Sequence, residues 1–448
     1  MRGMGLNDRL ARSSAWTTLG YGLSQAIRLA SNLILTRLLF PEAFGLMALV
    51  TVFIVGLAMF SDVGLAPTIQ RHARGDDPDF LNTAWTLQVL RGFGLSIACC
   101  LIAWPVAQLY GEPLLAWLLP VAGIALAIAG FNPTRIETAN RHLLVGKVTV
   151  LDLLSQIIGI ALTLLMTWVF RSVWALVIGS VLGSLVRLIL MHVLLPGTAN
   201  RFHWERAAAS ELVTFGKWIF CSTVCAFVLS QADKAILGKH LTLEMLGIYN
   251  IGFFIASFPL FMAAALNGRI MIPLYRERPP AHSSANFRAL RRLRLGFSAV
   301  VLGMQLTLAF FGAAIIGLLY DPRFTAAGAV VVAVACVNIP YLIGMTYDTA
   351  ALAAGDSRRV FYLTLCRAVL HVSLFLIGVE LAGLPGALAG QALAQILAHT
   401  VIIWVARHHG AWDPWHDLFW AIVASGLAAG AFWLNRDVLL PLQSFTAP

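Results

Sequence analysis

Long apolar stretches recur along the whole chain, separated by short polar segments. A stretch of about 20 apolar residues, wound as an α-helix, crosses the hydrocarbon core of a bilayer. In lipid the backbone must satisfy its own hydrogen bonds, and the alternating pattern of barrel strands is absent, so we predict membrane-spanning helices. We expect thirteen spans, at approximately 14–36, 44–66, 83–105, 114–134, 148–170, 173–195, 212–232, 245–268, 297–319, 326–350, 360–380, 384–406 and 415–435.

A weak internal repeat predicts how these helices are grouped. Residues 37–45 align with 239–247 at an offset of 202, and residues 137–139 align with 348–350 at an offset of 211. Six predicted spans separate equivalent positions, so both copies have the same orientation, as in a parallel repeat about the membrane normal. We therefore predict two six-helix lobes around a central cleft, with a count of 12 to 14 helices. The predicted parts are an N-lobe at 1–195, a C-lobe at 196–406, and an extra helix and tail at 407–448.

Composition and charge set the topology. Of 448 residues, 59% are hydrophobic and only 12% are charged, about half the charged share of an ordinary soluble domain. With the N-terminus in the cytoplasm, 20 of the 31 Lys and Arg residues fall in cytoplasmic segments and six on the opposite side. This bias follows the positive-inside rule. The net charge of +10 is thus mainly topological, and we expect no nucleic-acid partner. The basic segment 276–294 is interpreted as a topogenic loop that is also able to touch anionic headgroups.

The remaining five cations lie within predicted spans. A charge at membrane depth costs roughly 2.5–3.5 kcal/mol on insertion scales, so it requires a partner or a water-filled cavity. No run of acids at matching depth accompanies these cations, which favours an anion as the transported species. Snorkelling or local pairing, such as Asp62 with Arg91, is the alternative. The five cations are Arg28, Arg91, Arg187, Lys217 and Arg367.

The first span carries a polar face at helical spacing, which we interpret as a water-facing stripe. Its members are Tyr21, Ser24, Gln25, Arg28, Ser31 and Asn32. Arg28 lies roughly 20 Å from the cytoplasmic end, whereas the other four cations lie roughly 8–12 Å in. The predicted anion site comprises Arg28, Arg91, Arg187, Lys217 and Arg367 with the polar residues Gln25, Asn32 and Gln88. Motifs for phosphate loops, zinc sites or a serine nucleophile are absent, so we expect no catalytic residue, metal or cofactor.

Four segments near the N-terminus resemble the signature of Wzx-type polysaccharide exporters. They are Arg37-Leu-Leu-Phe-Pro-Glu-Ala-Phe-Gly45, Ser61-Asp-Val-Gly-Leu65, Ile69-Gln70 and Trp85-Thr-Leu-Gln-Val-Leu-Arg-Gly92. These exporters are lipid-linked oligosaccharide flippases of the multidrug/oligosaccharidyl-lipid/polysaccharide (MOP) superfamily, and the chain is most similar to those exporting colanic acid or succinoglycan. The resemblance implies a fold like that of MATE transporters and MurJ. Because family members have twelve or fourteen helices, thirteen is a departure.

The resemblance also implies a function. The expected substrate is an oligosaccharide linked to polyprenyl pyrophosphate, moved by alternating access from the cytoplasmic to the periplasmic face of the bacterial inner membrane. Expected partners are this substrate and membrane lipids, with a polysaccharide polymerase and chain-length proteins as further candidates.

Two alternatives remain open. An ion-coupled multidrug exporter of the same superfamily would need a buried acid for cationic drugs, but Asp62, Asp152 and Asp348 lie near helix ends. A membrane-embedded polysaccharide polymerase or ligase would need a large periplasmic loop, whereas the longest predicted loop, near 269–296, is cytoplasmic. The flippase is therefore favoured over both.

Overall fold

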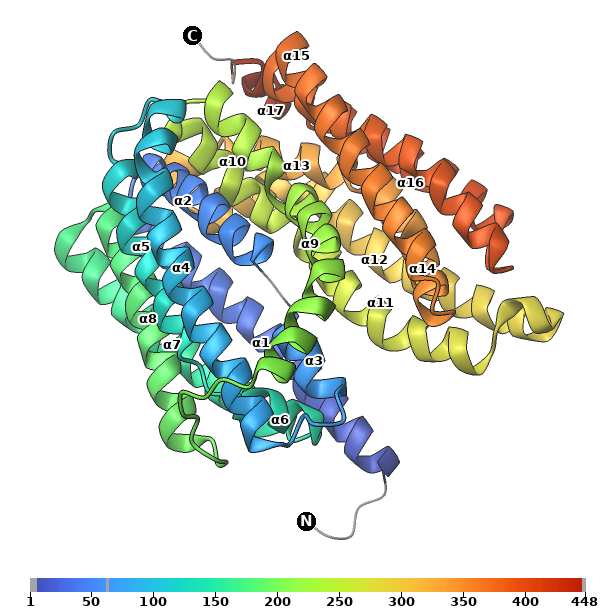
Figure 1. The fold of residues 1–448 in the computed structure, drawn as a ribbon. Coiled ribbons are helices and arrows are strands. Elements are labelled where there is room, and N and C mark those ends of the chain that lie inside the picture. The colour runs from blue at the N-terminus through green and yellow to red at the C-terminus, as the bar shows by residue number, and fades with distance from the viewer. Residues whose placement is uncertain (1–5, 62–63, 445–448) are drawn as a thin grey trace. The chain divides into compact units, whose positions relative to one another are not determined.

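The computed structural model describes residues 6–61 and 64–444, and no strand occurs among them (Figure 1). The longer helices are α1 (Leu6–Leu38), α2 (Pro41–Phe60), α4 (Pro78–Tyr110), α5 (Leu115–Gly130), α7 (Val145–Phe170), α8 (Val173–Leu194), α9 (Arg206–His240), α10 (Leu243–Ala256), α11 (Phe258–Glu277), α12 (Ser284–Leu319), α13 (Ala327–Val337), α14 (Ile339–Ala353), α15 (Ser357–His408) and α16 (Pro414–Leu434). Short helices are α3 (Leu65–Arg71), α6 (Arg135–Arg141), α17 (Arg436–Leu439), η1 (Pro280–His282), η2 (Pro322–Phe324) and η3 (Leu440–Ser444).

Every predicted span overlaps a helix, so the all-α membrane fold is confirmed. The count of thirteen is not confirmed. Within the described residues, eight helices are long and apolar enough to cross a membrane, or ten if each of two bent pairs is one span. One of the eight, α15, has 52 residues and covers two predicted spans. It is interrupted at Ala382 and at Gly383, whose φ of 59° is a conformation that glycine adopts without strain.

The chain forms two compact units, and the first comprises Met1–Leu39 and Leu46–Phe227. In this unit α1 packs on α7, α7 on α8, α8 on α5 and α5 on α4. Glycines permit close approach at two of these contacts. A Cβ on Gly92 of α4 would lie 3.0 Å from the Cα of Gly130 on α5, and one on Gly159 of α7 would lie 3.0 Å from the Cα of Gly183 on α8. Because lipid supplies no hydrophobic driving force between helices, close contacts between small residues help to hold membrane helices together.

The second unit comprises Phe40–Gly45 and Val228–Pro448. Its centre is α13, in which every side chain except that of Cys336 is buried. Around it, α12 packs on α13 and α16, and α14 packs on α11 and α15. An apolar cluster that includes Val301, Leu342 and Ala424 joins α12, α14 and α16.

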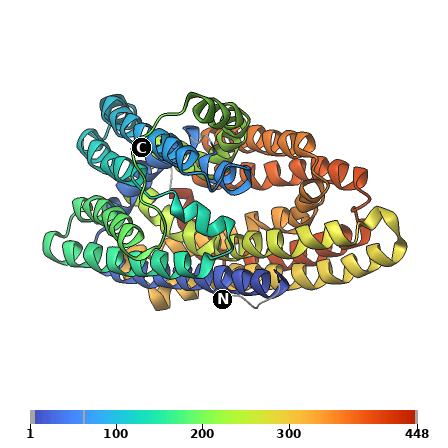
Figure 2. The ribbon, with the colours of Figure 1, turned by 60° about the horizontal axis from the view of Figure 1, so that its bottom comes forward.

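The expectation of a long loop near 269–296 is wrong, because both flanking helices continue into it. Helices α11 and α12 run side by side, joined by η1 (Figure 1, Figure 2). With 36 residues, α12 is about 54 Å long at 1.5 Å per residue, which exceeds the roughly 30 Å hydrocarbon core. Its basic end therefore extends beyond the apolar span, and Arg288 and Arg292 are exposed there.

Candidate functional site

A cavity of about 270 Å³ lies within the first unit, between α4, α8, the end of α2 and the join of α5 and α6. It brings together three of the predicted site residues: Gln88 and Arg91 from α4, and Arg187 from α8. Its other polar lining residues are Asn132, Thr134 and Glu137. The sequence predicted five cations as candidates for an anion site, and the side chains of two of them, Arg91 and Arg187, line this one cavity.

A broken helix shapes one wall of the cavity. Helices α5 and α6 are bent by 58° at residues 131–134. Pro133 explains the break, since it has no N–H to continue the helix and disfavours helical geometry at Asn132. The break leaves backbone carbonyl groups without their helical hydrogen bonds. Gln88 replaces two of these bonds, because its Nε2 donates to the carbonyl oxygens of Gly130 and Asn132, each at 3.0 Å. Gln88 thus stabilises the wall as well as lining it.

Arg91 is held in place from the end of α2. Its Nε donates to Ser61 Oγ at 2.8 Å, and its Nη2 donates to the carbonyl oxygen of Ala58 at 2.6 Å. The side chain is half-buried and lines the cavity. Asp62, its suggested partner, lies outside the described residues. These two contacts from the end of α2 orient the guanidinium where it lines the cavity.

The expectation that no acids match the buried cations is wrong for at least two of the five. Arg187 Nε donates to Asp152 Oδ1 at 2.8 Å, and Arg367 makes two hydrogen bonds to Asp348, at 2.6 and 2.9 Å. Each pair joins two packed helices, α7 with α8 and α14 with α15. The periodicity of a single helix does not reveal which neighbour faces it, so the sequence could not show these pairs.

The two ion pairs differ in exposure. The side chains of Arg187 and Asp152 are 37% and 43% exposed, whereas those of Arg367 and Asp348 are 13% and 19% exposed. Arg367 also stacks over the ring of Tyr341, with its Cζ 5.1 Å from the centroid. It belongs to the second unit and does not line the cavity. Arg187 is thus open to a ligand, while Arg367 is enclosed.

Some polar side chains of α1 make hydrogen bonds within the unit, and others are exposed. Ser24 Oγ donates to Gln156 Oε1 on α7 at 2.6 Å, and Gln25 Nε2 donates to Tyr21 OH at 2.9 Å. Arg28 is exposed and Asn32 is half-buried. None of the predicted residues on α1 lines the described cavity. Lys217 lies in α9, but its side chain is outside the described residues.

Three cavity residues were missed as site candidates. Asn132 Oδ1 is buried without a hydrogen-bond partner among the described residues. Glu137 Oε2 accepts from Gln70 Nε2 at 2.7 Å, and Thr134 Oγ1 accepts from Asn200 Nδ2 at 2.7 Å. The Asn-Pro-Thr sequence at 132–134 could have indicated them, because Asn-Pro marks a turn and here it follows an apolar run. The cavity therefore offers cationic donors beside carboxylate and amide acceptors.

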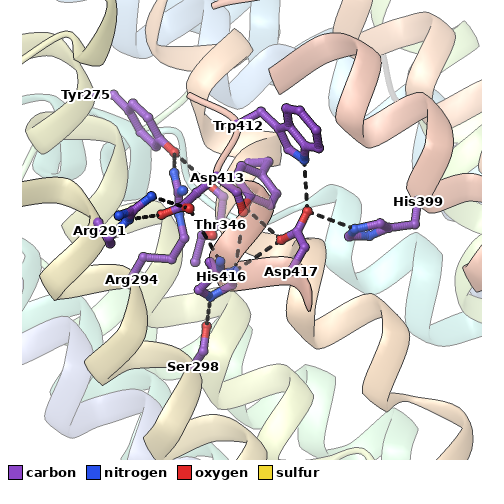
Figure 3. A network of polar contacts seen from close by, with 11 residues as sticks. Tyr275, Arg291, Arg294, Ser298, Thr346, His399, Trp412, Asp413, His416 and Asp417 are labelled. Atoms are coloured by element: carbon purple, nitrogen blue, oxygen red, sulfur yellow. Dashed lines mark hydrogen bonds and ion pairs between the residues drawn. The ribbon is translucent and has the colours of Figure 1, made fainter. Parts of the chain in front are cut away.

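A second polar cluster lies in the second unit (Figure 3). It joins α11, α12, α14, α15 and α16 through Tyr275, Arg291, Arg294, Ser298, Thr346, His399, Trp412, Asp413, His416 and Asp417. Tyr347 on α14 belongs to the same cluster, because its hydroxyl donates to Asp417 Oδ1 at 2.7 Å. Asp413, in the segment before α16, is fully buried and accepts two hydrogen bonds from Arg291, at 2.5 and 2.7 Å. Burial alone would raise the pKa of Asp413, but the hydrogen bonds and charge of Arg291 outweigh it, so this pKa is lowered. Asp413 is therefore held as an ionised anchor for α16.

These features define a multi-pass helical membrane protein, and solved members of the MOP superfamily share its fold. A solved structure of the lipid II flippase MurJ in an inward closed conformation matches with a TM-score of 0.69 and 12% identity, covering 94% of this chain and 99% of that one. An inward-facing multidrug resistance transporter of the MATE family matches with a TM-score of 0.61 and 16% identity, covering 91% and 96%. At these identities the likeness establishes the fold alone.

The chain belongs to the family described as polysaccharide biosynthesis protein, whose sequence pattern matches residues 34–329, well over half of the chain. The succinoglycan biosynthesis transport protein ExoT of Rhizobium meliloti (strain 1021) is 23% identical over 252 residues, which are 56% of this chain and 50% of ExoT. The lipopolysaccharide biosynthesis protein WzxC of Escherichia coli (strain K12) is 19% identical over 406 residues, 88% of this chain and 80% of WzxC. The match thus spans about half the length of ExoT. The predicted resemblance to Wzx-type exporters is confirmed.

Proposed function

We propose that this protein flips an oligosaccharide linked to polyprenyl pyrophosphate from the cytoplasmic to the periplasmic face of the bacterial inner membrane by alternating access, with its N-terminus in the cytoplasm. The observation that carries the proposal is the cavity in the first unit, where Arg91 and Arg187 lie together inside a transporter of the polysaccharide biosynthesis family. The name of ExoT describes transport in succinoglycan biosynthesis, which agrees with a glycan substrate.

The two arginines suit a pyrophosphate. Guanidinium groups bind phosphate oxygens through paired, charge-assisted hydrogen bonds that an ammonium does not reproduce. Arg91 is already oriented by Ser61 and Ala58. Arg187 bonds Asp152 through Nε in a half-exposed pair, so phosphate oxygens would compete with the carboxylate for the same guanidinium. An anion in the cavity thus gains two oriented cations.

The size and polarity of the cavity indicate which part of the substrate it takes. Its volume of about 270 Å³ is slightly below the range of roughly 300–1,000 Å³ for pockets that enclose drug-sized ligands. It therefore suits the pyrophosphate with part of the first sugar, while the rest of the glycan and the lipid tail lie elsewhere. The unpaired Asn132 Oδ1 and the Glu137 carboxylate provide acceptors for sugar hydroxyls.

The remaining predicted residues fit later steps of the path. Arg28, exposed on α1, would receive the pyrophosphate after it leaves the cavity, because a charge cannot enter the low-dielectric core without a partner. Gln25, Asn32 and Lys217 belong to this part of the proposal as polar neighbours along the route. The enclosed Arg367–Asp348 pair fits a structural role in the second unit better than substrate contact.

A flipping measurement tests the proposal. The protein is placed in proteoliposomes with a fluorescent polyprenyl-pyrophosphate oligosaccharide, and movement between leaflets is followed with a membrane-impermeant quencher. We expect Arg91→Gln to lower the initial rate about tenfold or more, equal to about 1.4 kcal/mol in the barrier. Arg171→Gln, which removes an exposed cation at the end of α7, should leave the rate unchanged. Equal rates for both variants, or uptake of cationic drugs instead of the lipid, would overturn the proposal.

A further inference from the structure

Asp417 in the first turn of α16 is surrounded by four hydrogen-bonding groups (Figure 3). Its Oδ1 lies 2.7 Å from Tyr347 OH and 3.1 Å from His416 Nδ1. Its Oδ2 lies 3.0 Å from Trp412 Nε1 and 3.2 Å from His399 Nε2. An ionised carboxylate offers about four acceptor positions. The contacts fill all of them, which stabilises the ionised form of Asp417.

An ionised Asp417 fixes where the two histidines carry their protons. Since the carboxylate only accepts, His416 must donate from Nδ1 and His399 must donate from Nε2. His416 Nε2 is then free to accept from Ser298 Oγ at 2.9 Å. His399 Nδ1 is different, because it is buried and has no hydrogen-bond partner among the described residues. It faces Gly344 on α14, where an added Cβ would lie 2.9 Å away. His399 thus keeps an unused proton-accepting nitrogen.

The rest of the cluster is balanced in charge. Arg291 pairs with Asp413. Arg294 donates from Nη2 to Tyr275 OH at 2.8 Å, and its Cζ lies 4.2 Å from the centroid of the Tyr347 ring. Together with Asp417, the cluster holds two guanidinium groups and two carboxylates. It is therefore neutral when both histidines are neutral, and one added proton changes its net charge.

Few other charges face His399. On α14, the Tyr347 hydroxyl bonds the same carboxylate, Asp417, as His399 does. The other ionisable group of that helix segment, Asp348, is bound by Arg367. From α16 it meets Asp417 and the neighbouring His416, and α13, which also packs on α15, has no charged residue. The carboxylate of Asp417 is thus the one charged group in direct contact with His399 in the described part of the chain.

We propose that His399 and Asp417 form a proton-binding site between α15 and α16. While the ring is neutral, Nε2 donates to the ionised carboxylate of Asp417. A proton on Nδ1 gives the ring a full positive charge and turns this contact into an ion pair, which adds an attraction between two opposite charges. Proton binding therefore fastens the beginning of α16 to α15, and proton release loosens it. This site lies outside the cavity of the first unit and does not depend on the proposed substrate.

The test uses the full-length protein in lipid nanodiscs, labelled with ¹⁵N at histidine and followed by NMR between pH 8 and pH 5, where imidazoles commonly change charge. His399→Gln identifies the His399 signal by its loss. We expect His399 to carry its proton on Nε2 at pH 8 and to gain a second proton on Nδ1 as the pH falls. Persistent neutrality across this range, or a neutral ring protonated on Nδ1, would overturn the proposal.

Hydrogen exchange tests the coupling to α16. After correction for intrinsic rates, the amides of residues 416–420 should exchange about threefold more slowly at pH 5 than at pH 8. His399→Gln keeps a donor but cannot take up a proton, so it should abolish this difference, whereas His408→Gln, exposed on the same helix, should preserve it. If His399→Gln does not fold, Asp417→Asn serves instead; it leaves His399 without a carboxylate to pair with and should also abolish the difference. A pH effect that survives in either folded variant contradicts the proposal.

Discussion

At the scale of single residues, the membrane-embedded cations differ by how their charge is held. Hydrogen bonds to Ser61 and Ala58 orient Arg91, a half-exposed acid holds Arg187, and a largely buried acid holds Arg367. Their positions within apolar stretches were predictable from sequence, because charge in such stretches is rare. Their partners were not, since Asp152 and Arg187 are 35 positions apart and meet only when α7 packs on α8. Arginines within apolar stretches therefore have different partners, and different expected roles, at different positions.

Arg187 and Arg367 are expected to respond differently to substitution. Arg187→Gln should leave the protein folded, because its partner Asp152 remains accessible to water. It should lower the flipping rate about tenfold, because the cavity loses one of its two guanidinium groups. Arg367→Gln leaves Asp348 buried without its cation, which for buried pairs costs about 3–5 kcal/mol. We expect a large fall in Tm in detergent, partly restored by adding Asp348→Asn. A stable Arg367→Gln protein with impaired flipping would instead make Arg367 a substrate contact.

A residue cluster outside the spans predicts a pH effect on stability. Hydrogen bonds from Arg74, at 2.7 Å, lower the pKa of Glu205 below its ordinary value of 4.5. A carboxylate with a lowered folded-state pKa stabilises the protein fully above its unfolded pKa, and this contribution disappears as the pH falls through the folded pKa. The Tm of Glu205→Gln should therefore lie below that of the unchanged protein at pH 6, and the difference should shrink as the pH falls below 4.5. A constant difference would contradict this assignment.

At the scale of elements, apolar stretches located the helices, but not their breaks. The predicted span 245–268 is divided at Ser257 into α10 and α11, and two spans bend at internal breaks, by 58° between α5 and α6 and by 46° between α13 and α14. Hydropathy averages over such breaks, whereas Pro133 and similar local residues determine them. The bent pairs overlap the fourth and the tenth predicted spans, which are six apart as the proposed repeat requires, although the breaks themselves do not align at the offset of 211.

The aligned segments 37–45 and 239–247 also contact one another reciprocally. A Cβ on Gly45 would lie 2.0 Å from the carbonyl oxygen of Leu243, and one on Gly247 would lie 1.9 Å from that of Pro41. At the offset of 202, Pro41 is equivalent to Leu243 and Gly45 to Gly247. Reciprocal contacts of this kind are typical of elements related by a two-fold axis. They support the proposal of a parallel repeat.

Gly247→Ala should therefore be strongly destabilising. The added methyl group meets backbone rather than a flexible side chain, and overpacking typically costs about 1–3 kcal/mol or more. Gly303→Ala on α12 is the matched control, since no atom lies within 4 Å of its added Cβ. That change should be neutral or stabilising, because alanine favours helix by up to about 1 kcal/mol. Thermal unfolding of both variants in detergent makes the comparison, and equal Tm values would refute the close contact.

At the scale of the whole molecule, the fold and the family establish a multi-pass helical membrane protein of the polysaccharide biosynthesis family. The sequence predicted this class because its apolar stretches, charge bias and N-terminal motifs all lead to the same conclusion. It did not reveal that Arg91, Arg187 and the Asn132–Glu137 segment share one cavity, since that depends on the packing of α4, α5 and α8. The proposed flippase activity rests on this cavity together with the family.

The most direct measurement of the central claim is the location of the lipid-linked oligosaccharide in cells that lack this protein but make the glycan. Spheroplasts are treated with a membrane-impermeant reagent that labels sugars. The account predicts that lipid-linked units accumulate and stay protected, and that restoring the protein, but not its Arg91→Gln variant, exposes them. Units that accumulate on the outer face, accessible to the reagent, would contradict the account and indicate a defect in polymerisation instead.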